Sequence, residues 1–381
     1  MRSKWEICTL GDILTLQRGF DLPTNRRQDG NIPVVSSSGI TGYHNVPKIK
    51  APGVVTGRYG TLGEVFYIEQ DFWPLNTTLY VRDFKGNNPK FISCFLQTLN
   101  LAHQNAAGAV PGLNRNALHL LPVRKPPVAT QCKIASILSN YDRLIENNTR
   151  RIKILSEMAR SLYDEWFVKF RFPGYEQTKM VDSELGLIPE GWKLKKLGEV
   201  VELVYGKALK AEQRLGGLVA VYGSSGIVGY HNKYLAKAPG IIVGRKGNVG
   251  SVFWSEDNFF PIDTVFYVQT KTCLYYVYYN LKNQNFINND AAVPGLNRNQ
   301  AYSLPFILPS QEALERFQDF VFPIFIQLKN LRIKNTNLRR TRDLLLPKLI
   351  SGEIDVENLD IETGVMNESE EVSNSSQEAI A

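Results

Sequence analysis

Apolar residues recur every three or four positions over residues 131–170, in the middle of the chain. The members of this stripe are Ile134, Ile137, Leu138, Tyr141, Leu144, Ile145, Ile152, Leu155, Met158, Leu162 and Trp166. This spacing is typical of one face of an α-helix, and neither Gly nor Pro interrupts the segment. Such a helix would be on the order of 55 Å long, at ~1.5 Å per residue. The pattern therefore predicts either a spacer helix or a long amphipathic helix packed on its own domain.

A second stripe with similar spacing begins near Gln311. Its members are Leu314, Phe317, Val321, Ile324, Leu328, Leu331, Leu338, Leu345 and Leu349. Pro323 lies inside the stripe and predicts either a kink or the true start of this helix. Asn148 and Asn335 interrupt the two stripes, and each would fix the register if the helices pack on each other.

The segments before the two helices contain short apolar runs separated by turn residues, a pattern that predicts strands. Most features of the first segment return 187 positions later. SSGITGYHN at residues 37–45 recurs as SSGIVGYHN at residues 224–232, and GRYGTLGEVF from Gly57 recurs as GRKGNVGSVF from Gly244. AVPGLNRN occurs twice without change, 183 positions apart. The chain is therefore an internal duplication.

We accordingly expect an α+β fold, with two similar strand-rich α/β domains and two long antiparallel, coiled-coil-like helices related by an internal pseudo-two-fold. The predicted domains are residues 1–130 and 176–310. The predicted helices occupy residues 131–175 and 311–354, and an acidic, disordered tail follows at residues 355–381.

The charge of the chain is distributed unevenly. The formal net charge is +7, but residues 355–381 hold eight acidic residues and no Lys or Arg, which leaves +15 on the rest. A folded body that basic indicates a polyanionic partner, most simply nucleic acid, although basic charge can also serve solubility.

No apolar run approaches the length of a membrane span, and the start of the chain lacks the apolar core of a signal peptide. We therefore expect a cytoplasmic protein without a membrane partner. The four cysteines lie far apart without a C-x-x-C pair, which argues against a zinc site or a disulfide framework.

Catalytic motifs are missing from the sequence. We find no Asn-Pro-Pro or Asp-Pro-Pro run of an adenine methyltransferase, and no serine-hydrolase or zinc-protease motif. Residues 244–251 read GRKGNVGS, which lacks the Lys that a phosphate-binding P-loop needs after its last Gly. Catalysis by this chain is not expected, and neither a metal nor a cofactor of its own is predicted.

The duplicated glycine loops are the first candidate for a binding site. Each has an apolar run before it, another after it, and three glycines spaced by three, so strand, loop, strand is the natural interpretation. Glycines permit tight turns, and they also let backbone N–H groups approach an anion. Arg58 in the first loop, and Arg245 with Lys246 in the second, are candidates for contacting a guanine edge or a phosphate.

The SSGI-x-GYHN segments supply small hydroxyls, an aromatic ring and an imidazole that suit base-edge and phosphate contacts. The candidates are Ser37, Ser38, Tyr43, His44, Ser224, Ser225, Tyr230 and His231. The alternative is that the Tyr and His side chains only pack the hairpin.

In the repeated AVPGLNRN segment, Pro-Gly predicts a turn that displays the polar residues behind it. These further candidates for DNA contact are Asn114, Arg115, Asn297 and Arg298. The alternative is a helix-capping turn.

In their order along the chain, these motifs resemble the DNA specificity subunit of type I restriction-modification systems, from Trp5 to about Val356. The motifs that carry the resemblance are LQRGF, GRYG, VPGLNR in both copies, LYDEWFVKF, GLIPEGW at residues 186–192 and RDLLLPKLISGEI at residues 342–354. The acidic tail and the missing Pro-Glu-Gly before Trp5 depart from the family pattern.

The resemblance implies two target-recognition domains, each reading one half of a bipartite site in double-stranded DNA, and two helices that set the spacer. It also implies two modification subunits that dock on the helices and methylate adenine with S-adenosylmethionine, and restriction subunits that use ATP and Mg. Because the loops are nearly identical, we expect the half-sites to share some bases. Two alternatives remain open: a self-sufficient DNA-modifying enzyme, and a duplicated protein-binding adaptor without a DNA role.

Overall fold

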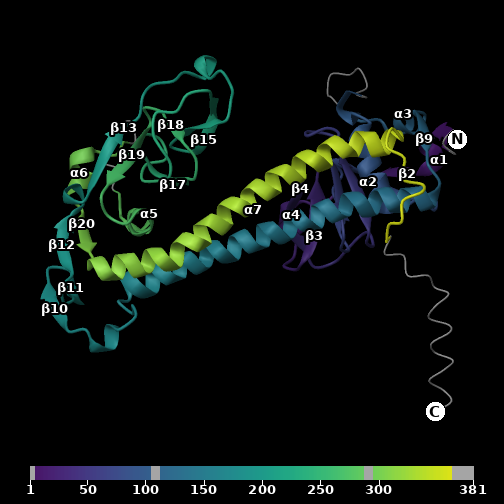
Figure 1. The fold of residues 1–381 in the computed structure, drawn as a ribbon. Helices are drawn as coiled ribbons and strands as arrows, with labels where there is room; N and C mark the ends of the chain where they lie inside the picture. Colours follow the sequence, from purple (N-terminus) through teal and green to yellow (C-terminus); the bar gives the residue numbers. More distant parts are fainter. Residues whose placement is uncertain (1–4, 104–111, 287–294, 363–381) are drawn as a thin grey trace, which may run out of the picture. The chain divides into compact units, whose positions relative to one another are not determined.

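The computed structural model describes residues 5–103, 112–286 and 295–362, and the chain divides into two compact units (Figure 1). The first unit contains Met1–Asn147 and Asn335–Ala381, and the second contains Asn148–Lys334. Each unit therefore combines one strand-rich domain with parts of both long helices.

The first unit contains two small sheets and a strand pair. The four-stranded sheet has the order β2-β8-β5-β6, the three-stranded sheet has the order β4-β3-β7, and β1 pairs with β9. The bounds of these strands are β1 Glu6–Thr9, β2 Thr15–Arg18, β3 Ile32–Ser36, β4 Gly39–His44, β5 Gly53–Gly57, β6 Val65–Ile68, β7 Trp73–Pro74, β8 Thr78–Asp83 and β9 Pro122–Lys125. The short helices are α1 Leu10–Ile13, α2 Pro89–Thr98 and α3 Arg115–His119.

The second unit repeats this plan. Its sheets have the orders β13-β19-β16-β17 and β15-β14-β18, β12 pairs with β20, and a β10-β11 hairpin precedes them. The bounds of the strands are β10 Met180–Ser183, β11 Gly186–Pro189, β12 Lys193–Lys196, β13 Val201–Tyr205, β14 Val219–Gly223, β15 Gly226–His231, β16 Gly240–Gly244, β17 Val252–Ser255, β18 Phe259–Pro261, β19 Val265–Thr270 and β20 Pro305–Leu308. The short helices are α5 Leu274–Asn283 and α6 Arg298–Ser303. The matching strand orders confirm the predicted duplication.

Two long helices, α4 (Val128–Tyr163) and α7 (Gln311–Ser351), occupy the two apolar stripes. The first begins three residues before the predicted start and continues into a π-helical turn, Asp164–Val168. The second begins at Gln311, so Pro323 does not mark its start. Both helices were predicted from their apolar periodicity, and the structure confirms them, but the helical residues end at Val168 and Ser351, before the predicted ends at 175 and 354.

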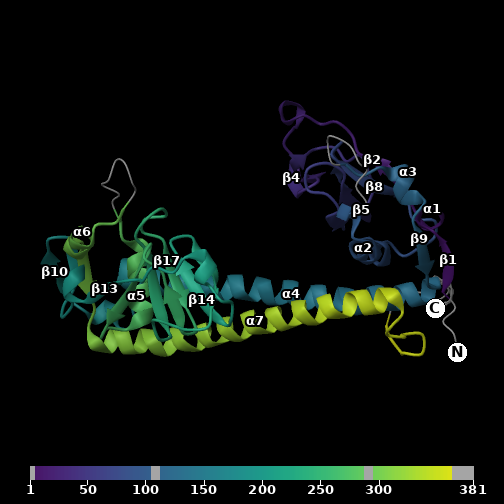
Figure 2. The same cartoon turned by 90° about the horizontal axis from the view of Figure 1, so that it is seen from above.

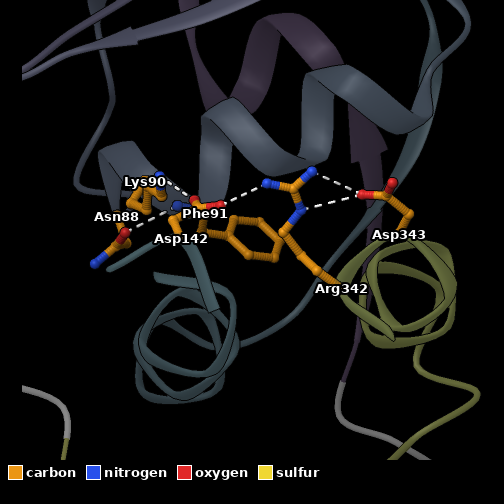
Figure 3. Close-up of polar contacts among 6 residues, drawn as sticks. All are labelled: Asn88, Lys90, Phe91, Asp142, Arg342 and Asp343. Carbon is orange, nitrogen blue, oxygen red and sulfur yellow. Dashed lines mark hydrogen bonds and ion pairs between the residues drawn. The ribbon is translucent and has the colours of Figure 1, made fainter. Parts of the chain in front are cut away.

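In the first unit, the two helices pack side by side and run antiparallel. Asn335 Nδ2 donates to the carbonyl oxygen of Ile145 at 3.3 Å, and Arg342 Nη1 donates to Asp142 Oδ1 at 2.7 Å. From Asn335 to Arg342 the residue number rises along α7, while the number of the contacted residue on α4 falls from Ile145 to Asp142. The two helices are therefore antiparallel. Figure 3 shows Lys90 of α2 reaching the same carboxylate, at 2.9 Å. Asn335 is buried and bonded to the other helix, which supports the predicted register role.

The helices of the second unit are joined by aromatic packing. The Phe317 ring of α7 lies 4.9 Å from Phe167 and 6.0 Å from Trp166, which follow α4 in the π-helical turn. Further along α7, the ring centre of Phe325 lies 4.8 Å from that of Tyr275. Tyr275 belongs to α5, and this helix lies against the N-terminal half of α7 (Figure 2). The Phe167–Phe317 contact is edge-to-face and the other two are tilted, and such ring pairs add specific geometry to the apolar core.

The beginning of the acidic tail is packed, so the prediction of disorder from residue 355 is wrong for residues 355–362. Val356 is buried in the core of the first unit. Lys133 Nζ donates to the carbonyl oxygens of Glu357 and Leu359 at 2.8 and 2.9 Å, and Ser136 Oγ donates to that of Glu362 at 2.8 Å. The prediction was based on acidic composition, which does not register a single buried apolar residue, Val356, or hydrogen bonds to backbone carbonyl oxygens. Residues 363–381 lie outside the described residues.

No helix in the described parts of the chain is long and apolar enough to cross a membrane.

Candidate nucleic-acid interface

The glycine loop and the helix after the PGLN segment meet in both units, although they lie far apart in the sequence. In the first unit, the Leu113 N–H donates to the carbonyl oxygen of Arg58 at 3.0 Å. In the second, the Leu296 N–H donates to that of Arg245 at 2.7 Å. Most of each VPG turn, residues 104–111 and 287–294, lies outside the described residues. The two pairs bring Arg58 beside α3 and Arg245 beside α6.

Each loop is fixed from its other side by the neighbouring strand. The Arg58 N–H donates to the carbonyl oxygen of Thr77, and the Arg245 N–H donates to that of Thr264, each at 2.9 Å. Gly60 has φ +80°, a conformation that L side chains rarely adopt. The positive φ alone therefore accounts for a glycine at this position. Arg58 and Arg245 each begin a loop, and the backbone of each arginine is hydrogen-bonded on both sides.

In the second unit, the residues brought together line a depression of about 330 Å³. The residues that line it are Tyr205, Arg245, Lys246, Gly295, Leu296, Asn297, Arg298 and Asn299. Three of them are cationic and none is acidic. A concave surface lined by positive charge focuses the electrostatic field, and this raises the local concentration of polyanions near it.

Aromatic rings hold the arginines of both clusters. Arg58 Cζ lies 4.4 Å from the ring centre of Tyr59, and its Nη2 donates to the hydroxyl oxygen of that residue at 3.2 Å. In the second unit, Tyr205 contacts two guanidinium groups, Arg245 at 5.1 Å and Arg298 at 4.9 Å. These cation–π contacts orient the guanidinium groups while leaving Arg245 and Arg298 partly exposed.

Asn114 and Asn297 occupy the N-cap positions of α3 and α6. Asn114 Oδ1 accepts from the Asn116 N–H at 2.9 Å, and Asn297 Oδ1 accepts from the Asn299 N–H at 2.9 Å. This is the capping turn considered as an alternative for the motif. Both asparagines are nevertheless exposed, and the residues after them, Arg115 and Arg298, open their helices.

The serine turns lie against the glycine loops. A Cβ at Gly60 would lie 3.2 Å from Ser37 Oγ, and one at Gly247 would lie 3.1 Å from Ser224 Oγ. Each turn also exposes its second serine, Ser38 in the first unit and Ser225 in the second. Ser37 is only 9% exposed, so this predicted contact residue is buried against the glycine loop, whereas Ser224 is partly exposed. The remaining serine, arginine and asparagine candidates are parts of one surface in each unit.

The histidines of the GYHN segments are not on this surface. His44 and His231 are 7% and 8% exposed, and His44 Nδ1 accepts from the Gln28 N–H at 3.1 Å. The imidazoles stand edge-on to Trp73 and Phe260, at 5.4 and 5.7 Å. Both histidines therefore pack the hairpins, as the alternative to DNA contact predicts.

The tyrosines next to these histidines point the other way. Tyr43 and Tyr230 are 53% and 51% exposed, because successive residues of a strand face opposite sides. They remain available for contact with a partner.

Two aromatic residues of the clusters, Tyr59 and Tyr205, were not among the sequence candidates. Tyr59 stands inside the GRYG loop that was singled out for its arginine, and Tyr205 ends the strand equivalent to LQR. The combination of an aromatic residue with an Arg on a turn could have found Tyr59, whereas Tyr205 has no Arg beside it in the sequence and meets its arginines only through the tertiary fold. No group of three or more His, Cys, Asp or Glu side chains within residues 5–103, 112–286 and 295–362 could hold a metal ion.

Residues 2–156 and 189–339 match the family model of the type I restriction modification DNA specificity domain. The chain is 25% identical over 283 residues to the type I restriction enzyme MjaIX specificity subunit of Methanocaldococcus jannaschii, which covers 65% of this chain and 64% of that relative. Less than two thirds of that relative's length is therefore spanned.

A second relative is the type I restriction enzyme HindI specificity subunit of Haemophilus influenzae, 22% identical over 335 residues that cover 66% of this chain and 73% of the relative. The fold is similar to the crystal structure of the S subunit of a type I restriction-modification system from M. genitalium, with a TM-score of 0.64 and 18% identity over 92% of this chain and 96% of that chain. The family model matches both copies of the duplication and most of the chain, so the protein belongs to the type I restriction-modification DNA specificity family.

Proposed function

We propose that this chain is the DNA-recognising specificity subunit of a type I restriction-modification complex. Each recognition domain binds one half of a bipartite site in double-stranded DNA. The observation that carries the proposal is the cluster that both units assemble in the same way, in which Arg58 or Arg245 is tied to a helix that starts with a second arginine. A duplicated basic surface of this kind suits a duplicated anionic target.

Two kinds of DNA contact follow from the chemistry of the clusters. Arg115 and Arg298, which start α3 and α6, suit phosphate oxygens, which provide affinity that falls with salt but carry no sequence information. Arg58 and Arg245, held by rings on a fixed loop, suit bidentate contact with a base edge. The buried histidines His44 and His231 are left out of this interface.

Catalysis belongs to partner subunits in this proposal. Two modification subunits would bring S-adenosylmethionine for adenine methylation, and restriction subunits would use ATP and Mg, all in the cytoplasm. The helices α4 and α7 would dock the modification subunits and set the spacer. Support comes from apolar side chains that the helices expose in the second unit, where a docking partner needs apolar contact: Ile154, Met158, Phe322 and Ile326.

The proposal is tested with the chain in complex with the modification subunits from the same source. DNA retention is measured by fluorescence anisotropy at several salt concentrations, for the unmodified chain, R58A and R245A. We expect binding that weakens steeply with salt, and a further loss of about tenfold in each variant. Each loss should be confined to DNA that keeps the half-site of the altered domain.

The matched control is R82A, because Arg82 is an exposed arginine near the far end of the strand that begins at Thr78 beside the cluster. It should bind DNA like the unmodified chain. The absence of salt-sensitive DNA binding would support the adaptor alternative. Methyl transfer or cleavage by the purified chain alone would support the enzyme alternative, and either result would overturn the proposal.

The bases shared by the half-sites are a separate prediction. Mapping of methylated adenines in cells that hold the complex would show two half-sites with common positions. Half-sites without any common base would contradict it.

A further inference from the structure

The two clusters differ in where they carry an aromatic ring and a cation. Tyr59 of the first glycine loop corresponds to Lys246 in the second, 187 positions later. The last residues of β2 and β13, the first strands of the four-stranded sheets, show the reverse exchange. Here the first unit has the cation, Arg18, and the second unit has the ring, Tyr205. The main arginines, the capping asparagines and the serine turns are the same in both units.

Sheet register shows that the strand positions are structurally equivalent. Arg18 of β2 lies opposite Leu79, which in turn lies opposite Thr56 on β5. Tyr205 of β13 lies opposite Phe266, and Phe266 lies opposite Val243 on β16. Each of these residues is 187 positions from its counterpart. Arg18 therefore ends its strand at the place from which Tyr205 reaches the second cluster.

Both rings are exposed although each holds an arginine. Tyr59 is 37% exposed beneath Arg58, and Tyr205 is 46% exposed between its contacts with Arg245 and Arg298. An exposed ring beside a fixed guanidinium group can make apolar contact with a base, such as the methyl group of thymine. The first ring comes from the loop, and the second comes from the neighbouring strand.

The number of cations is the same in both clusters. The first has Arg58, Arg115 and, by its register equivalence with Tyr205, Arg18; the second has Arg245, Lys246 and Arg298. The sequence-independent attraction to phosphates is thus matched. What differs is the position of the flat apolar surface relative to the shared arginine.

We propose that the exchanged pairs, Arg18 with Tyr59 and Tyr205 with Lys246, determine where the two half-sites differ in sequence. The inference rests on the proposed role in DNA recognition. The residues common to both clusters read the bases that the half-sites share. The exchanged pairs read the bases at which they diverge, because a ring and a long cation contact different groups on a base pair.

The test is the double variant Y205R/K246Y, which gives the second domain the pair of the first and preserves its three cations. The complex with modification subunits is used to select sites from DNA randomised in both halves. We expect the half-site of the second domain to change toward that of the first, while the other half stays the same. Affinity for the newly selected site should stay within about threefold of the original, because the charge is unchanged.

The control is N248T, which places the residue of the first loop, Thr61, at an exposed position of the second loop. It should select the original site. The reverse exchange, R18Y/Y59K, provides an independent measurement on the first domain if Y205R/K246Y fails to fold, as judged by thermal unfolding.

The outcomes separate the two proposals. If the folded exchange variants select the original half-sites, the inference is overturned while DNA recognition stands. If the unmodified complex shows no sequence-selective, salt-sensitive binding, the proposed function fails and the inference fails with it. A changed half-site in the altered domain alone supports both.

Discussion

The side-chain nitrogen of Gln131 donates a hydrogen bond to Oδ1 of Asn87 at 2.8 Å, and both residues are buried. The same nitrogen donates to the carbonyl oxygen of Pro126 at 3.0 Å, and Gln131 Oε1 accepts from the Asn88 N–H at 3.0 Å. One amide thus joins the first turn of α4 to the loop that leads into α2. Buried polar groups that are satisfied by a single side chain become costly when that side chain is lost.

Replacing Gln131 by leucine should lower the free energy of unfolding of the first unit by about 2–3 kcal/mol, because two buried polar groups and one partly buried N–H lose their partner. Leucine fits a helix at this place, since the equivalent residue 183 positions later is the buried Leu314. N140A, at an exposed position of the same helix, should change the value by less than about 0.5 kcal/mol. The measurement is urea unfolding, with hydrogen exchange of α2 amides to locate the effect. Equal stability of the two variants would show that the amide network contributes nothing.

Periodicity and repetition were enough to predict the helices and the duplication, because both are properties of the chain read in one dimension. The start of α4 was placed three residues late because Val128 precedes the regular stripe and its first turn is anchored by Gln131, a polar residue. The packed start of the tail escaped prediction for a similar reason. One apolar side chain, Val356, decides its position within an acidic sequence.

The candidate site was predicted in pieces, but its assembly was not. The hydrogen bond from the Leu113 N–H to the carbonyl oxygen of Arg58 could not be predicted from the sequence, because it depends on the tertiary path of the chain between the two residues. The GYHN motif shows the opposite limit. Tyr43 and His44 are neighbours that were equally good candidates for DNA contact by residue type. The alternation of side chains along a strand exposes Tyr43 and buries His44.

Acid should weaken the contact between α4 and α7 in the first unit. Burial alone would raise the pKa of Asp142, but hydrogen bonds from Arg342 and Lys90 outweigh burial and lower this pKa below its ordinary value of 3.8. The folded protein therefore binds fewer protons than the unfolded chain. The contribution of Asp142 is present above about pH 3.8 and is lost as pH falls through the lower pKa of the folded state.

The variant D142N tests this contact at neutral pH. It should lose about 1–2 kcal/mol at pH 7, a value that allows for partial exposure of the ion pair. The deficit should shrink as the pH is lowered, because acid removes the same charge from the unmodified chain. D343N is the control, since Asp343 is an exposed partner of the same arginine and should matter little. A deficit that is independent of pH in urea unfolding would contradict the assignment.

His119 gives the first unit a sensitivity to mild acid at a position where the second unit has Tyr302. Its Nε2 accepts a hydrogen bond from the Leu16 N–H at 2.9 Å, so protonation would place a hydrogen where an acceptor is needed. Burial, followed by the charges of Lys85 and Arg115, lowers the pKa of His119 below 6.5. The unfolded chain thus takes up the proton first, and stability is lost as pH falls from about 6.5 through the pKa of the folded state.

The second unit provides the variant that tests this mechanism. Tyr302 occupies the place of His119, and its hydroxyl oxygen accepts from the Leu203 N–H at 2.9 Å. H119Y should therefore keep the acceptor and flatten the dependence of unfolding free energy on pH between 5 and 7. H103Q, which alters an exposed histidine, should leave the dependence unchanged. If H119Y retains the full acid sensitivity, another group is responsible for it.

Two further arginines outside the clusters hold the serine hairpins in place. Arg27 Nη1 donates to the carbonyl oxygen of Thr41 at 3.1 Å, and Arg214 Nη1 donates to that of Val228 at 2.7 Å. Each guanidinium group lies against the glycine that follows its acceptor residue. A Cβ at Gly42 would lie 2.8 Å from Arg27 Nη1, so the close approach depends on glycine. The arginines therefore clamp the strand that follows each serine turn.

R214A should loosen the hairpin of β14 and β15 without removing a charge from the DNA-binding cluster. We expect a loss of about 1–2 kcal/mol in the free energy of unfolding, since a charge-assisted hydrogen bond is removed. Amide exchange should accelerate in β15 and stay unchanged in β4 of the first unit, while R27A should show the reverse pattern. Because the turn carries Ser224 and Ser225, R214A should also weaken binding to the half-site of the second domain only. Faster exchange in both hairpins, or in neither, would show that these arginines do not act as local clamps.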